Sequence, residues 1–215
     1  MEENEEIKTI NKFDEWAETY DKGIWSLYFN YSYKKTIKIA QKYLCKESEI
    51  LDIACGTGSL IIPISFLKQT KKIIGIDISK KMIKKTLEKI KKIPHKNKNK
   101  IVILKENVNR MHFPSNKFNA AFSLNSFHHY ADALPEINRV LKENGLFFLV
   151  DNFSSGILRK IWNKFLKIYF NEKKVKYFDK DGLDKLLIKN GFDILEQKTL
   201  LYFVLISVCK KRREI

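Results

Sequence analysis

Hydrophobic residues along the chain follow two patterns, short continuous runs and longer segments in which they recur at helical spacing. The runs predict buried strands, and the periodic segments predict amphipathic helices. The expected strands span residues 49–54, 72–77, 101–105, 118–124, 145–151, 193–199 and 202–209. The expected helices between them span residues 58–68, 79–93, 132–142 and 179–190. Strands that alternate with helices indicate an α/β fold with a mostly parallel sheet.

The last two expected strands follow each other without a helix, so we expect the last strand to be antiparallel. With 215 residues the chain has the size of one α/β domain, and no second domain is expected in residues 1–215. Residues 7–46 should be helical, so that residues 1–46 form an N-terminal helical cap beside the ligand site. Residues 152–178 form an insertion between strand five and the next helix.

The stretch from Ile50 to Leu60 reads as a strand, a tight turn and the start of a helix. Gly56 and Gly58 allow backbone conformations that other residues avoid, and they let a ligand approach the main chain closely. Turns of this kind lie at the carboxyl end of a strand, where open α/β sheets bind their ligands. We therefore interpret the stretch as a ligand-binding turn.

A carboxylate ends the next expected strand and indicates which ligand the turn binds. Asp77 follows Gly58 by 19 residues, close to the roughly 20-residue offset at which an acidic residue meets a ribose hydroxyl. A dinucleotide fingerprint would have a third glycine where the chain has Ile61. Asp52 would repel a pyrophosphate but can accept hydrogen bonds from an ammonium group. The pattern favours a nucleoside that carries an amine.

These motifs resemble the class I S-adenosylmethionine-dependent methyltransferases, in particular the small-molecule branch with the ubiquinone and menaquinone biosynthesis enzymes. The resemblance runs from about Phe13 to Lys210, with Ala54 in place of a glycine and Asn107 in place of an aspartate. The motifs that carry it are Leu51–Gly58, Gly75–Met82, Glu106–Pro114 and Leu134–Gly145. It implies a Rossmann-like seven-stranded sheet with helices on both faces. It also implies S-adenosylmethionine as cofactor and S-adenosylhomocysteine as product.

The resemblance assigns a role to each residue around the cofactor. Asp52 would bind the amino end of the methionine moiety, Asp77 the ribose hydroxyls, and Asn107 the adenine amine. Ile78 and Met82 would flank the adenine. The complete expected set is Tyr20, Asp52, Ala54, Cys55, Gly56, Thr57, Gly58, Asp77, Ile78, Met82, Asn107, Val108 and Asn125. Tyr20 lies in a segment, Phe13–Asp21, that closes over the cofactor in the family, although its aromatic residues also suit simple packing.

Two adjacent histidines, His128 and His129, follow the fourth strand at its ligand-binding edge. An imidazole there can take a proton from a hydroxyl group, because its ordinary pKa lies close to neutral. The other interpretation is that both rings stabilise the loop. No metal site is expected, since neither these histidines nor the three cysteines have a third ligand at suitable spacing.

The insertion contains a predicted basic amphipathic helix, from Gly156 to Phe170. Trp162 and Phe165 lie on its apolar face. We expect a lid over the acceptor pocket. The alternatives are a pocket wall that also makes peripheral contact with membrane lipid, and a helix that binds a protein partner.

The net charge of +16 invites a nucleic-acid interpretation, because basic surfaces attract phosphates. The lysines are spread over nearly every expected helix, which favours codon bias in an AT-rich genome. The densest cluster, Lys91–Lys100, is expected to be a solvated loop. Nucleic-acid methyltransferases that act on exocyclic amines carry a catalytic Asn/Asp-Pro-Pro-aromatic motif. Residues 125–128 lack its prolines, so a nucleic-acid substrate is disfavoured.

The sequence thus predicts a cytoplasmic methyltransferase that acts on a small lipophilic or aromatic acceptor. The acidic start of the chain lacks the apolar core of a secretory signal, and no apolar run reaches the length of a membrane span. The alternative functions are those of an RNA methyltransferase, of a nicotinamide-dependent oxidoreductase, and of a decayed protein that binds S-adenosylmethionine without transferring its methyl group. Ala54, Asn107 and Asn119 keep the decayed alternative open. The residues carry no signal for an oligomeric state.

Overall fold

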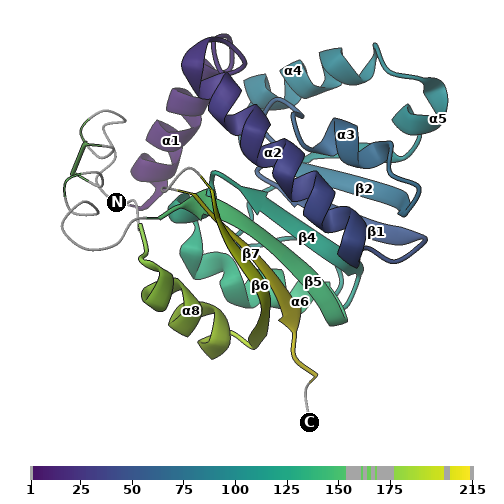
Figure 1. Cartoon of the computed structure of the whole chain (residues 1–215). Coiled ribbons are helices and arrows are strands. Elements are labelled where there is room, and N and C mark those ends of the chain that lie inside the picture. The colour runs from purple at the N-terminus through teal and green to yellow at the C-terminus, as the bar shows by residue number, and fades with distance from the viewer. Residues whose placement is uncertain are drawn as a thin grey trace. The chain divides into compact units, whose positions relative to one another are not determined.

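The structure, a computed structural model, describes residues 2–153, 161, 164, 165, 168, 177–200 and 204–213. The chain forms two compact units, Met1–His112 and Phe113–Ile215, and each is described by itself (Figure 1). Its strands are hydrogen-bonded in the order β3-β2-β1-β4-β5-β7-β6.

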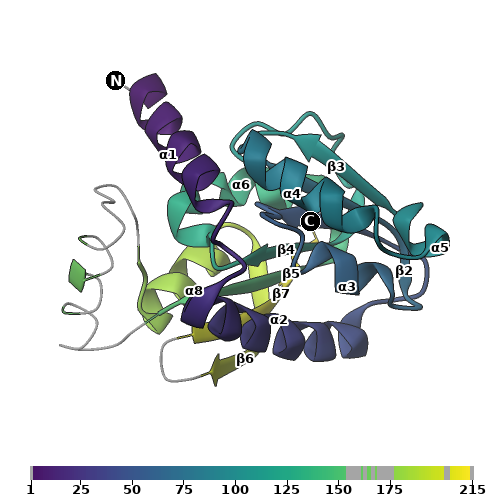
Figure 2. The same cartoon turned by 90° about the horizontal axis from the view of Figure 1, so that it is seen from above.

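The first unit contains three parallel strands and their connecting helices. Its elements are α1 (Glu2–Trp16), α2 (Gly23–Tyr43), β1 (Ser48–Ile53), α3 (Ile61–Ser65), β2 (Thr70–Asp77), α4 (Lys80–Ile90), α5 (His95–Lys98) and β3 (Ile101–Lys105). Side chains along β1 and along the 73–77 part of β2 are almost all buried, as expected for strands covered on both faces. β2 pairs with β1, and β3 pairs with the other edge of β2, so both connections cross the sheet in the same direction. Since such crossovers are right-handed, α3 and α4 lie on the same face of these strands (Figure 2).

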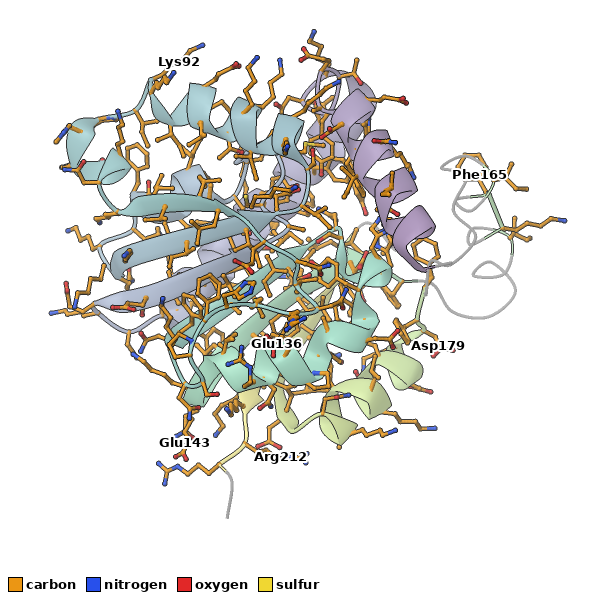
Figure 3. The ribbon with its side chains drawn as sticks, turned by 180° about the vertical axis from the view of Figure 1, so that it is seen from behind. Lys92, Glu136, Glu143, Phe165, Asp179 and Arg212 are labelled. Atoms are coloured by element: carbon orange, nitrogen blue, oxygen red, sulfur yellow. The ribbon has the colours of Figure 1, made fainter. Side chains whose placement is uncertain are left out.

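The described residues of the second unit form four strands and two longer helices. Its elements are β4 (Phe118–Leu124), the 3-10 turns η1 (Phe127–His129) and η2 (Ala131–Ala133), α6 (Leu134–Val140), β5 (Leu141–Asn152), α8 (Lys180–Lys189), β6 (Phe192–Leu200) and β7 (Val204–Lys211). β4 and β5 are parallel, whereas β7 is antiparallel to both of its neighbours, β5 and β6. Asp179 caps α8 by accepting a hydrogen bond from the Gly182 N–H (2.8 Å; Figure 3).

The predicted architecture is confirmed: seven strands, mostly parallel, with the last strand antiparallel and helices around the sheet. The helix expected over residues 58–68 spans only Ile61–Ser65. It cannot begin at Gly58, whose left-handed φ of 83° no helix accommodates. Residues 7–46 form two helices with a turn between them. β5 begins earlier than expected, at Leu141, and is irregular around Asn144, whose φ is 58°.

The lysine-rich segment differs from the expected solvated loop. It contains the short helix α5, and within it the Asn97 side chain is buried and donates a hydrogen bond to the Ser65 carbonyl (3.0 Å). The predicted helix from 156 to 170, with Trp162, lies mostly outside the described residues. Its described apolar residues, Ile161, Phe165 and Ile168, are all exposed. Within the described part of the chain, no helix combines the length and apolar character needed to cross a membrane.

Candidate cofactor site and active site

The turn between β1 and α3 places alternate residues in the left-handed region, with φ values of 52° at Ala54, 55° at Gly56 and 83° at Gly58. A Cβ atom on Gly58 would lie 2.9 Å from Thr86 Cγ2, so a side chain there would clash with α4. A Cβ atom on Gly56 would meet nothing closer than the Ala54 carbonyl oxygen, 4.0 Å away. The backbone at Gly56 therefore borders open space that a ligand can approach.

The Gly56 residue is hydrogen-bonded through both of its backbone groups. Its N–H donates to Asp77 Oδ2 (2.8 Å), and its carbonyl accepts from the Thr86 hydroxyl (2.6 Å). The other oxygen of Asp77 accepts from the Ser79 N–H (2.9 Å). Asp77 therefore stabilises the backbone conformation of the turn. This structural role was not predicted from the sequence.

Burial raises the pKa of Asp77, and the N–H donors of Ser79 and Gly56 oppose that shift by stabilising the ionised form. The Ile78 N–H acts in the same direction, so three backbone N–H groups contact the carboxylate. Its two oxygens offer about four acceptor positions, which leaves room for a further donor. Asp77 can thus shape the turn and still accept a hydrogen bond from a ribose hydroxyl.

Asp52 lies near the carboxyl end of β1 and is only 2% exposed. Among the described residues, none donates a hydrogen bond to its buried Oδ2 atom. Burial raises the pKa of Asp52 well above its ordinary value, and the nearby charge of Asp77 adds to the shift. A buried polar atom left unsatisfied costs about 1–3 kcal/mol, so this oxygen is suited to a donor supplied by a ligand.

Cys55 lies in the turn that follows β1, close to the charges of Asp77 and Asp52. Burial raises the pKa of its thiol well above the ordinary value, and Asp77 and Asp52 act in the same direction. The thiol therefore stays neutral and serves as a small packing group rather than a nucleophile.

An acidic row from the N-terminal segment binds α4 and the turn; it consists of Asp14, Glu18 and Asp21. Asp14 accepts hydrogen bonds from the Ser79 hydroxyl and the Lys81 N–H at the start of α4. Two ion pairs of 2.7 Å follow along α4, Glu18 with Lys85 and Asp21 with Lys89.

Asp21 also reaches the ligand-binding turn, where its Oδ1 accepts hydrogen bonds from the hydroxyls of Thr57 (2.8 Å) and Ser59 (3.3 Å). The acidic row was not predicted from the sequence. Its signal was the three- and four-residue spacing of the acids, matched by the four-residue spacing of Lys81, Lys85 and Lys89.

Tyr20 lies between Glu18 and Asp21 and is held by an aromatic cluster. Its ring stacks on Phe29 at 5.3 Å between centroids and meets the edge of Trp16 at 4.8 Å. Burial raises the pKa of its phenol well above the ordinary value, and a hydrogen bond with Tyr33 adds to the effect. The tyrosine thus anchors the segment, and its expected contact with cofactor stays a prediction.

The residues expected around adenine follow the carboxyl ends of β2 and β3. Ile78, Asn107 and Val108 are each partly exposed there. The Asn107 carboxamide oxygen accepts a hydrogen bond from the Asn109 N–H (2.9 Å). Met82 differs, because it is only 2% exposed and packs inside the unit.

In the second unit, Asn125 follows β4 in the left-handed conformation (φ 56°), and its N–H donates to the Val150 carbonyl of β5 (2.7 Å). His128 comes next, 9% exposed, with its ring centroid 4.3 Å from that of His129. Its Nδ1 atom lies 2.7 Å from Oδ1 of Asp151, which the sequence analysis did not single out. No local pattern links the two residues, since they are 23 positions apart and meet only when β4 and β5 pair.

Comparisons with known proteins show what the chain is similar to. Residues 51–149 match the family described as a methyltransferase domain. A demethylmenaquinone methyltransferase from Symbiobacterium thermophilum is 28% identical over 206 residues, which cover 82% of this chain and 81% of that protein. An uncharacterised protein from Methanocaldococcus jannaschii is also 28% identical, over 85% of this chain and 75% of its own.

A solved structure is similar in fold over nearly the whole chain. It is the magnesium protoporphyrin IX methyltransferase from Synechocystis PCC 6803 with bound S-adenosylhomocysteine. It superposes with a TM-score of 0.70 and 19% identity, and the match covers 94% of each chain.

Proposed function

Since the chain is a class I S-adenosylmethionine-dependent methyltransferase that resembles the quinone methyltransferases, we propose that its acceptor is a small, partly apolar molecule. Similar proteins are named for demethylmenaquinone and for magnesium protoporphyrin IX. Near His128 the structure has a cavity of about 10 Å³, lined mainly by apolar side chains. That volume is about one water molecule, so the cavity supports an apolar setting for His128 rather than a finished acceptor pocket.

The observation that best supports the proposed cofactor site is Asp52, whose buried Oδ2 has no donor among the described residues. The ammonium group of a methionine moiety would supply that donor and a compensating positive charge. The open backbone at Gly56 would border the same moiety, and the Asp77 carboxylate would accept a hydrogen bond from a ribose hydroxyl. The residues present therefore fit the cofactor.

Adenine would lie between Ile78 and the segment that begins at Asn107. The Val108 N–H is proposed to donate to a ring nitrogen, and the Asn107 carboxamide to accept from the exocyclic amine. Met82, which is buried, would support the residues around the adenine by packing behind them. When bound, S-adenosylmethionine supplies an activated methyl group, so the protein has mainly to orient the acceptor and remove its proton.

Calorimetry on the purified protein tests the cofactor half of this proposal. S-adenosylmethionine and S-adenosylhomocysteine should bind, and NAD should not. Binding of NAD without binding of S-adenosylmethionine would overturn it. Methyl-labelled S-adenosylmethionine should then be offered with separate pools of quinols, phenols, amines, carboxylates and RNA.

Transfer to quinols or phenols is the expected result of that assay. Label found only in RNA would instead support the RNA methyltransferase, and cofactor binding without transfer to any pool would support the decayed protein. The pairing of Lys85 and Lys89 with acidic side chains reduces the basic surface available to RNA. Peripheral membrane contact by residues 152–178 stays a prediction.

A further inference from the structure

Asp151 and His128 are joined by two hydrogen bonds, through both oxygens of the carboxyl group. Asp151 Oδ2 accepts the backbone N–H of His128 (2.8 Å), and Oδ1 lies 2.7 Å from Nδ1 of the imidazole. Oδ1 also accepts the N–H of Asn152 (2.7 Å). The carboxyl group thus holds both the backbone and the ring of His128.

These bonds determine which imidazole nitrogen carries the proton. An ionised carboxylate only accepts hydrogen bonds, and each oxygen of Asp151 already accepts one from a backbone N–H. The bond to the ring therefore requires Nδ1 to donate, which leaves Nε2 of the neutral imidazole with a free lone pair. The nitrogen opposite the carboxylate is thereby available to accept a proton.

The ring of His128 is held on its other sides as well. Tyr177 stacks on it with 4.9 Å between centroids and 27° between planes, and His129 packs against it at 4.3 Å. Asp151 is 7% exposed and His128 is 9% exposed, so solvent has little access to the pair. A hydrogen bond to a charged group is strong in such surroundings.

We propose that Asp151 is a positioning residue that holds His128 as the Nδ1–H tautomer, so that Nε2 accepts the proton lost by the methyl acceptor. This inference rests on the proposed function. The proton leaves a hydroxyl group of the acceptor for Nε2, and its bonding electron pair stays on the acceptor's oxygen. The resulting imidazolium keeps its Nδ1–H bond to Asp151, whose negative charge stabilises it, and later releases the proton to water.

A purely structural role predicts a different outcome. Asp151 would then tie the turn after β4 to β5, and its loss would lower stability without affecting the chemistry of a folded enzyme. The titratable groups that the structure places against His128 are Asp151 on β5, His129 in η1 and Tyr177 before α8. The tests must therefore separate the tautomer and turnover from stability.

Nitrogen NMR on the full chain, labelled in its histidine rings, reads the tautomer directly. The chain has four histidines, and the signals of His128 are those absent in His128→Gln. We expect neutral His128 to carry its proton on Nδ1, and Asp151→Asn to reduce the population of that tautomer. His112, whose ring is 81% exposed beside Glu106, serves as an internal reference that Asp151→Asn leaves unchanged. A proton on Nε2, or the same tautomer in both proteins, would overturn the proposal.

Kinetics with 1,4-naphthoquinol as the probe acceptor test the catalytic consequence. We expect His128→Gln and Asp151→Asn each to lower kcat by about 100-fold or more, the usual scale for general-base catalysis. The KM for naphthoquinol and the Kd for S-adenosylmethionine should change less than about threefold, because neither side chain is assigned to binding. Circular dichroism and the cofactor Kd identify variants that have failed to fold.

A folded Asp151→Asn protein with unchanged kcat would show that the carboxylate is only structural. Asp151→Glu provides the second variant, since it retains the charge and should recover part of the lost kcat if positioning is its role. If the unmodified protein binds no S-adenosylmethionine, the proposed function fails, whereas the NMR result still decides whether Asp151 sets the tautomer.

Discussion

At the scale of single residues, Ala54 occupies a conformation that alanine disfavours, with φ at 52° in the ligand-binding turn. The left-handed conformation costs an L-residue about 1–2 kcal/mol, whereas glycine adopts it freely. Ala54→Gly should therefore stabilise the folded state by about 0.5–1 kcal/mol, after allowing for the greater freedom of glycine in the unfolded chain. In a chain of this length the melting temperature should rise by about 1–4 °C.

The matched control for that measurement is Gly56→Ala, at a residue with nearly the same φ of 55°. It should lower the melting temperature for the same reason that Ala54→Gly raises it. A lower melting temperature for Ala54→Gly would show that the alanine methyl group contributes packing worth more than the strain.

Asp52 gives a second prediction at this scale, in which stability and binding change in opposite directions. Its pKa in the folded protein is raised by burial and by Asp77, so folding favours the protonated form. The stabilisation from Asp52 is therefore complete below its unfolded pKa near 3.8 and is lost as pH rises through the higher folded pKa. Asp52→Asn removes this loss, so without cofactor the stability of the variant relative to the parent should increase as pH rises above about 3.8.

The same variant should bind S-adenosylmethionine about 10- to 100-fold more weakly, because it lacks the carboxylate proposed to meet the ammonium group. Thermal melting across the pH range and calorimetry near neutral pH measure the two effects. Unchanged affinity would remove Asp52 from the cofactor site, even if the stability trend is as expected.

At the scale of elements, the acidic row ties the N-terminal segment to α4 and to the ligand-binding turn. Asp21 forms an ion pair with Lys89 and accepts hydrogen bonds from the hydroxyls of Thr57 and Ser59 in the turn. The ion pair of Glu18 with Lys85 joins it to α4. Asp21→Asn should therefore raise the Kd for S-adenosylmethionine by about two- to tenfold, and Glu18→Gln by less. Both effects should shrink at high salt, which screens exposed ion pairs.

Calorimetry at low and high salt measures these changes. Glu143→Gln is the matched control, because it makes the same change in net charge at an exposed residue of β5, in the other unit (Figure 3). An equal effect of Glu143→Gln would mean that net charge, rather than the acidic row, sets the affinity.

At the scale of the whole molecule, features encoded within a few neighbouring residues were predictable. The buried runs of β1 and β2 and the small-residue turn after β1 produce their structure locally. The helix expected from residue 58 was too long because the left-handed Gly58 that makes the turn also prevents the helix from starting there.

Contacts between distant residues could not be predicted in the same way. Asp151 meets His128 only through the pairing of β4 with β5, and Asp14 reaches α4 across 65 residues to cap its first turn. Asp77 was recognised as a strand-end acid, yet its bond to Gly56 depends on two adjacent strands placing their ends together. Spacing along the chain identifies the types of residue in such a site, and the fold determines their partners.

The Thr86 hydroxyl on α4 donates a hydrogen bond to the Gly56 carbonyl, 30 positions earlier in the chain. Thr86 therefore helps to fix the backbone of the ligand-binding turn. Because Asp77 also accepts the Gly56 N–H, both backbone groups of Gly56 are held by bonds within the protein. A mutational scan for cofactor affinity should consequently score Thr86 among the sensitive positions, although no contact with the ligand is assigned to it. Divergence of the enzyme toward other cofactors would have to begin with such supporting residues as well as with the turn.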